Sequence, residues 1–227
     1  MRFVAPQFSS LALLGVSVLL ASCAGVGGPA GSGNVIARAR KIGLVHAPEA
    51  IPGVKIDLRY RSGGNAGGRP LYPANMPCLV NRSTAVRLAK AQKLMQSQGY
   101  GLKIWDAWRP VEAHQALWNA VKDPRYVVPP SDGLSLHCYG IAVDVTLVDS
   151  LGRELRMPSK YDEFSPAAKA RYTGGDPEIR RNVEALQSAM RDAGFRSIPD
   201  EWWHFDNLNA TNVRRVSAES VGLKLPY

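Results

Sequence analysis

The sequence predicts a single α+β domain with a mostly antiparallel sheet. Segments that alternate apolar and polar residues are interspersed with segments whose apolar residues recur at helical spacing. These segments do not follow the regular strand–helix–strand order that builds a parallel sheet. The chain has 227 residues, of which 45% are hydrophobic, and this is enough for one domain with a substantial core.

Four segments are predicted as strands. Residues 54–60 (VKIDLRY) alternate apolar and polar side chains, and residues 101–105 (GLKIW) form a short run before Pro110. Residues 141–148 (IAVDVTLV) are an apolar strand, and residues 201–205 (EWWHF) form a short strand or turn. The glycine-rich and proline-rich stretches between the predicted elements are expected to be loops.

Three segments are predicted as amphipathic helices. They cover residues 85–98, 111–121 and 177–193, and each places its apolar residues on one face. Gly99 and Gly194 end the first and the third of them, because glycine adopts the left-handed conformation that closes many helices.

The N-terminus has the pattern of a bacterial secretory signal. Arg2 precedes an apolar run, Leu11 to Leu20, which is too short to span a membrane comfortably but is typical of a signal peptide. The run ends in LASC, at Cys23, and this resembles the lipobox of bacterial lipoproteins, whose cysteine is lipidated. An ordinary signal peptide that happens to contain a cysteine is the alternative.

The predicted organisation therefore has three parts. They are a signal peptide (residues 1–22), a lipidated Cys23 with a flexible tether (residues 23–45), and a folded domain (residues 46–227). Lipid on Cys23 would hold the protein on a membrane. Because Ala24 resembles an outer-membrane sorting residue, we expect the periplasmic side of the outer membrane in the cell envelope.

The distribution of charge bears on the binding partners, and the cysteine content bears on disulfide formation. The chain has 28 basic and 19 acidic residues, a net charge of +9, but no basic stripe interleaved with aromatic residues, so no nucleic-acid partner is expected. If Cys23 carries lipid, Cys78 and Cys138 remain as a pair in an oxidising compartment. A disulfide between them is our hypothesis.

A first candidate for a metal site lies in SLHCYGIAVD, residues 135–144. Because side chains alternate along a strand, Asp144 lies on the face opposite to the apolar residues Ile141 and Val143. Gly140 permits a bend that brings His137 back toward Asp144. An imidazole and a carboxylate together are ligands suited to zinc.

A second candidate cluster is EWWHF. Together with His137 and Asp144, His204 would give three ligands and leave one position open for water, as catalytic zinc sites require. Glu201 would then be free to act as a general base. A flat strand places Glu201 and His204 on opposite faces, so a turn or bulge must bring them together. The two tryptophans between them are expected to wall the site.

Each candidate also has an ordinary structural explanation. Isolated histidines are usually structural, which is our interpretation of His46 and His114. Asp144 alone suits a hydrogen-bond acceptor at a strand end, and His204 alone suits a packed side chain. Cys138 is left out of the site, because adjacent residues rarely point at one metal ion.

A third stretch, WDAWRP, places Arg109 at the end of a predicted strand. Its guanidinium can donate forked hydrogen bonds to a carboxylate or an oxyanion. The alternative is a surface ion pair between Asp106 and Arg109, which would contribute little to stability.

Taken together, these stretches resemble the zinc D,D-peptidases. SLHCYGIAVD is similar to their SxHxxGxAxD motif, EWWHF to their ExxH motif, and WDAWRP to the arginine-bearing segment of the VanX-type D-alanyl-D-alanine dipeptidases. The resemblance extends through LRY (58–60), QGYGLKIWDAWRP (98–110), MPSKYDEF (157–164) and RRNVEALQSAMRDAGF (180–195). It covers most of residues 50–206 in the same order.

The resemblance implies a small α+β zinc peptidase fold, shared with lysostaphin-like enzymes and the hedgehog signalling domain. It also implies that one Zn²⁺ is bound by His137, Asp144 and His204. In this family pattern, Glu201 corresponds to the general base that activates the zinc-bound water, and Arg109 corresponds to the group that stabilises the oxyanion.

The same resemblance implies a small D-amino-acid dipeptide, D-Ala-D-Ala, as the substrate. Ser135, Tyr60, Asp106 and Asp162 correspond to positions that line the family's substrate pocket, and Tyr60 and Asp162 would face the free amino group. Two other functions stay open: a D,D-carboxypeptidase acting on peptidoglycan stem peptides, and a non-catalytic, zinc-containing binding module of the envelope.

Overall fold

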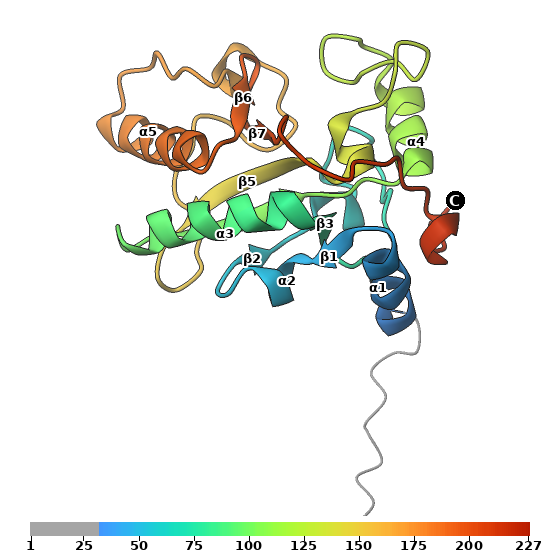
Figure 1. Cartoon of the computed structure of the whole chain (residues 1–227). Coiled ribbons are helices and arrows are strands. Elements are labelled where there is room, and N and C mark those ends of the chain that lie inside the picture. Colours follow the sequence, from blue (N-terminus) through green and yellow to red (C-terminus); the bar gives the residue numbers. More distant parts are fainter. Residues whose placement is uncertain (1–31) are drawn as a thin grey trace, which may run out of the picture.

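The computed structural model describes residues 32–227 and confirms the predicted α+β class. Within these residues, the main sheet has the strand order β2-β4-β5-β7-β6, and β2, β5, β6 and β7 are labelled in Figure 1. Only β2 and β4 are parallel, and the other neighbours are antiparallel. A second, two-stranded sheet pairs β1 with β3. The strands are β1 Leu44–His46, β2 Lys55–Ile56, β3 Leu79–Asn81, β4 Gly101–Asp106, β5 Ala142–Val148, β6 Arg196–Ile198 and β7 Glu201–Asp206.

Two helices cover the sheet together. In Figure 1, α3 crosses in front of β5, and α3 and α5 pack against each other and against strands of the main sheet. Their apolar faces bury residues such as Leu88, Met95, Leu186 and Met190, as predicted from the sequence, whereas Val86 of the predicted α3 face is 68% exposed. The helices are α1 Ser32–Lys41, α2 Ala47–Ala50, α3 Arg82–Gln96, α4 Val111–Val121 and α5 Pro177–Asp192.

The ends of these helices follow local capping rules. The side chain of Asn81 accepts a hydrogen bond from the Ser83 N–H (2.8 Å), so α3 begins three residues earlier than predicted. The side chain of Asp176 accepts from the Glu178 N–H (2.9 Å) and starts α5. The bounds of α4 are those that the sequence predicts.

The strands β3 and β6 and the short helix α2 were not predicted, and two predicted segments differ in extent. The strand expected over residues 54–60 is limited to Lys55–Ile56, because the chain then turns into a 3₁₀ helix, η1 (Arg59–Arg61), that places Tyr60 inside. The tether predicted over residues 23–45 also extends too far toward the C-terminus. Part of it forms α1 and β1, and Val35 of α1 is buried against the domain.

The signal peptide and the lipid site at Cys23 lie outside the described residues. Among residues 32–227, no helix combines the length and the apolar character that crossing a bilayer requires. The hypothesis of a Cys78–Cys138 disulfide is wrong for this structure, where both residues are free and buried. The carbonyl of Cys78 accepts the Ala47 N–H, and that of Cys138 accepts the Val216 N–H.

One glycine closes the short 3₁₀ helix η2 (Leu136–Tyr139), which precedes β5. Gly140 has a φ of +66°, in the left-handed region. A Cβ there would lie 2.8 Å from Cδ2 of Leu44 and 2.9 Å from the backbone nitrogen of Asn81. The bend that the sequence predicts at this position therefore depends on the absence of a side chain.

We expect Gly140→Ala to lower the free energy of unfolding by about 1–3 kcal/mol, because a strained φ and a backbone clash act together. Urea denaturation monitored by circular dichroism measures this change. Gly175→Ala is the matched control, since a Cβ at that position would have no atom within 4 Å. Equal denaturation midpoints for the two variants would contradict the role assigned to Gly140.

Candidate metal centre and active site

Three side chains from separate elements meet at one point. They are His137 from η2, Asp144 from β5 and His204 from β7, and one ligand atom from each lies within 4.8 Å of the others. The Nε2 atom of His137 is 3.2 Å from Nδ1 of His204 and 3.3 Å from Oδ1 of Asp144. Nδ1 of His204 is 3.0 Å from the same Asp144 oxygen. The structure thus brings together the three ligands expected from the sequence.

Strand register explains why these residues meet. Asp144 of β5 is directly opposite His204 of β7, and Asp106 of β4 is opposite Asp144. Directly opposite residues of antiparallel strands point to the same face of a sheet. Asp106, Asp144 and His204 therefore lie side by side, and η2 brings His137 over them.

A bulge places Glu201 beside the cluster. Ser197 of β6 is opposite Phe205, but the next residue, Ile198, is opposite Glu201, so β7 carries extra residues at this point. As a result, Oε2 of Glu201 lies 3.7 Å from Nδ1 of His204. The sequence predicts that a turn or bulge is needed here, and the structure has one.

Hydrogen bonds from outside the cluster orient the three side chains. Nδ1 of His137 donates to the carbonyl of Ala107 (2.7 Å), and Nε2 of His204 donates to Oδ1 of Asp206 (3.0 Å). The hydroxyl of Tyr161 donates to Oδ2 of Asp144 (2.8 Å). Each imidazole thus has one nitrogen held by the protein and the other turned toward the cluster.

Sequence reasoning missed Tyr161 and Asp206. Asp206 had a signal, because a residue two positions after His204 in a strand points to the same face. Tyr161 had none beyond its position next to Asp162. The three converging side chains turn two imidazole nitrogens and a carboxylate oxygen toward one point, and these atoms fit a divalent metal ion that prefers nitrogen and oxygen ligands.

Arg109 is held by a buried ion pair. Its Nε and Nη2 atoms donate to Oδ2 of Asp106, at 3.0 and 2.7 Å, and the Tyr72 hydroxyl donates to the other carboxylate oxygen (2.6 Å). The side chain of Asp106 is 0% exposed and that of Arg109 is 8% exposed, so the surface-pair alternative is wrong. Asp106 does not line the cavity as predicted: it lies beneath Arg109 and fixes its position.

The cluster opens into a cavity of about 230 Å³. The predicted residues that line it are His137, Asp144, His204, Glu201, Arg109, Ser135, Tyr60 and Asp162. Much of the remaining wall is apolar and comes from α4 and the loop after it. The side chain of Ser135 accepts the N–H of His137, so this serine starts η2 and also faces the cavity.

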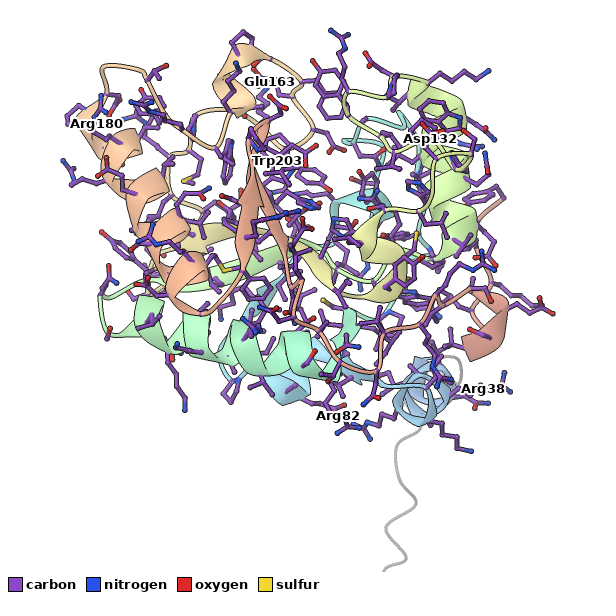
Figure 2. All side chains as sticks on the ribbon, turned by 45° about the horizontal axis from the view of Figure 1, so that its top comes forward. Arg38, Arg82, Asp132, Glu163, Arg180 and Trp203 are labelled. Atoms are coloured by element: carbon purple, nitrogen blue, oxygen red, sulfur yellow. The ribbon has the colours of Figure 1, made fainter. Side chains whose placement is uncertain are left out.

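The two tryptophans of β7 do not wall the cavity as expected. Both Trp202 and Trp203 are buried in the core, and Figure 2 shows Trp203 in the interior. The ring of Trp203 packs edge-on against Tyr161, with centroids 5.6 Å apart, and so supports a residue that contacts Asp144.

Of the two histidines assigned to structural roles, one lines the cavity. His114 is fully buried, and its Nε2 donates to the carbonyl of Val128 (3.0 Å). Burial lowers its pKa to about 4, so the imidazole is neutral near pH 7. His46 lies away from the cavity, 3.1 Å from Oε1 of Glu49.

Burial and proximity shift several pKa values. Burial raises the pKa of Glu201 to about 8. Burial alone would lower the pKa of His204, but its hydrogen bonds to Asp144 and Asp206 outweigh this effect and raise it to about 10. Because a metal ion must displace the proton from Nδ1 of His204, metal binding is expected to weaken at low pH.

Comparison with known proteins bears on what this cavity does. The family model described as D-ala-D-ala dipeptidase, of the M15 peptidases, matches residues 40–221. The chain belongs to the M15 D-Ala-D-Ala dipeptidase family. It is 36% identical to the D-alanyl-D-alanine dipeptidase of Escherichia coli K12 over 163 residues, which is 72% of this chain and 83% of the relative. It is 29% identical to the one from Enterococcus faecium, over 73% of this chain and 91% of the relative.

Membership of the M15 family confirms the resemblance carried by the three motifs and makes the chain a peptidase. Family membership therefore indicates that the cavity is a site for dipeptide hydrolysis. In this M15 peptidase, all three motifs contribute residues that line the cavity.

The carboxyl group of Asp162 is expected to make the stability of this M15 peptidase depend on pH. Burial is the main cause that raises its pKa from 3.8 to about 6. The folded protein therefore holds this proton more tightly than the unfolded chain does. The carboxyl contributes stability at low pH, and that contribution is lost as pH rises from about 3.8 to about 6.

We expect Asp162→Asn to raise the free energy of unfolding at pH 7 by about 1–3 kcal/mol, and to have a much smaller effect at pH 4. Asparagine tolerates the positive φ of 56° at this position. Denaturant titrations at both pH values measure the difference. The exposed Asp132 (Figure 2) provides the control variant Asp132→Asn. The same stability difference at pH 4 and pH 7 would contradict the prediction.

Proposed function

We propose that this enzyme hydrolyses the free dipeptide D-Ala-D-Ala and uses one Zn²⁺ ion held by His137, Asp144 and His204. One observation carries the proposal: these residues, Glu201 and Arg109 all line one cavity of about 230 Å³. The names of the relatives support D-Ala-D-Ala as the substrate, and the size of the cavity suits a small molecule.

A bound zinc ion would lower the pKa of a water molecule and polarise the scissile carbonyl. The chain's own part in proton transfer falls to Glu201. Its carboxylate lies on the cavity beside His204 and has a pKa raised to about 8 by burial. A base with a pKa near the working pH accepts a proton from water and returns it to the leaving amine.

Arg109 is the proposed partner of the oxyanion that forms on the scissile carbonyl. Its position is fixed in advance, because two of its nitrogens are bound to the buried Asp106 and its guanidinium lies over the ring of Tyr60, 4.9 Å from the centroid. A donor that needs no reorganisation stabilises developing charge effectively, and one such group is typically worth about 3 kcal/mol.

Asp162 is the proposed partner of the substrate's free amino group. It lines the cavity, and Oδ2 accepts the N–H of Ala66 (3.0 Å), which holds the carboxylate in place. Burial raises the pKa of this carboxyl group, and a positively charged ammonium group on the substrate would lower it again and favour the ionised carboxylate. A dipeptide whose amino group is blocked would leave the carboxylate without that partner, so the site should select against it.

We expect the zinc-loaded enzyme to cleave D-Ala-D-Ala and to cleave N-acetyl-D-Ala-D-Ala at least about 10²-fold less efficiently, because one charged contact is lost. Product analysis by chromatography measures both rates.

We expect the Glu201→Gln variant to keep its zinc and to lose at least about 10²-fold in kcat, because it lacks the base.

Equal cleavage of the capped dipeptide or of a stem pentapeptide would favour a D,D-carboxypeptidase. A Glu201→Gln variant with normal turnover would contradict the assignment of the base. Zinc binding without cleavage of any of these substrates would favour a non-catalytic binding module.

We also propose that the mature enzyme is anchored by lipid at Cys23, on the periplasmic side of the outer membrane, where it would act on dipeptides released from peptidoglycan. The apolar run and the LASC sequence support this address. In a bacterial host, the wild type should sediment with membranes and Cys23→Ala should not. Equal membrane association of the two proteins would contradict lipid attachment at this cysteine.

A further inference from the structure

Asp206 stands at the end of β7, behind His204. Its Oδ1 accepts a hydrogen bond from Nε2 of His204 at 3.0 Å. Because the two residues are two positions apart in a strand, their side chains share a face of the sheet. Asp206 is 4% exposed, so this hydrogen bond is shielded from competing water.

The carboxylate of Asp206 has no closer ionic partner than His204 among the described residues. Arg196 is 3.5 Å away, and its side chain is 64% exposed, so water screens that contact. A buried carboxylate is costly unless it is paired. The pairing that accounts for its burial is therefore the one with the imidazole.

The two imidazoles of the cluster are held differently. Nδ1 of His137 donates to a neutral acceptor, the carbonyl of Ala107, at 2.7 Å. Nε2 of His204 donates to a carboxylate, which is a stronger acceptor. Oδ2 of Asp106 also lies 3.5 Å from Nδ1 of His137, but this oxygen already accepts two hydrogen bonds from Arg109. Both imidazole hydrogen bonds fix a tautomer, but only the second joins the ring directly to a carboxylate, which makes the opposite nitrogen more basic.

We infer that Asp206 is a positioning residue for the metal centre: it fixes His204 with Nδ1 turned toward Asp144 and His137 and strengthens its hold on the metal ion. This inference rests on the proposed function, because it takes His204 as a metal ligand. It adds a fourth residue, outside the three motifs, that sets metal affinity through a ligand and not by binding the metal itself.

The test is the zinc affinity of Asp206→Asn, measured by competition with a chromophoric chelator. Asparagine has nearly the same shape and keeps an acceptor oxygen, but it removes the charge. Loss of such an outer partner typically lowers metal affinity about 10–100-fold, and we expect a loss in that range. Asp206→Ala, which also removes the acceptor, should lose at least as much.

Further measurements separate positioning from a general structural role. The thermal midpoint of the zinc-free variants shows whether they fold. Asp192→Asn makes the same chemical change at an exposed position and should bind zinc like the wild type. Asp206 lies on the wall of the cavity, but its Oδ1 is held by Nε2 of His204. At saturating zinc, Asp206→Asn should therefore recover most of its kcat with KM unchanged.

A folded Asp206→Asn variant with wild-type zinc affinity would overturn the inference. A lasting rise in KM at saturating zinc would also overturn it, because that would place Asp206 in substrate binding. A wild type that binds no zinc would instead refute the proposed function, so the two failures are distinguishable.

Discussion

The site depends first on one cross-strand pairing, Asp144 of β5 opposite His204 of β7. A slip of one residue in this register would turn one of the two side chains to the other face of the sheet and separate the ligands. Every residue of β5 is buried, between β4 and β7 and beneath the helices, so the core strongly specifies the register. The packing of an apolar strand thus fixes the geometry of a polar cluster.

This arrangement places several charges in the interior, where each one needs a partner. Asp106 and Asp144 are neighbours across β4 and β5, and two carboxylates in this position repel each other. Arg109 and Tyr72 satisfy Asp106, while the two histidines and Tyr161 surround Asp144. The polar network is therefore built from pairs that would each be unfavourable if one member were removed.

The sequence predicted local features well because they depend on nearby residues. Alternation along residues 141–148 showed that Asp144 was available, and the need for a bulge followed from the spacing of Glu201 and His204. The family motifs, and not periodicity, joined these distant segments into one site. Asp106 was predicted to line the pocket, yet it lies under Arg109, because motif positions do not reveal depth within the fold.

The remaining features depend on long-range packing that single segments do not encode. Tyr161 reaches Asp144 from an irregular loop, and its position depends on the rings of Trp105 and Trp203 around it. The sequence of residues 32–45 predicts a tether because it follows a glycine-rich stretch, but α1 folds onto the domain through its small apolar face. Trp202 and Trp203 were expected at a polar site and instead complete the core beneath it.

The most direct test of the proposed metal centre is zinc-edge anomalous diffraction from crystals of the enzyme grown with one equivalent of Zn²⁺. We expect one strong peak per chain, within bonding distance of Nε2 of His137, Nδ1 of His204 and a carboxylate oxygen of Asp144. No peak at that position, or a peak bound by other side chains, would contradict the assignment of these three ligands.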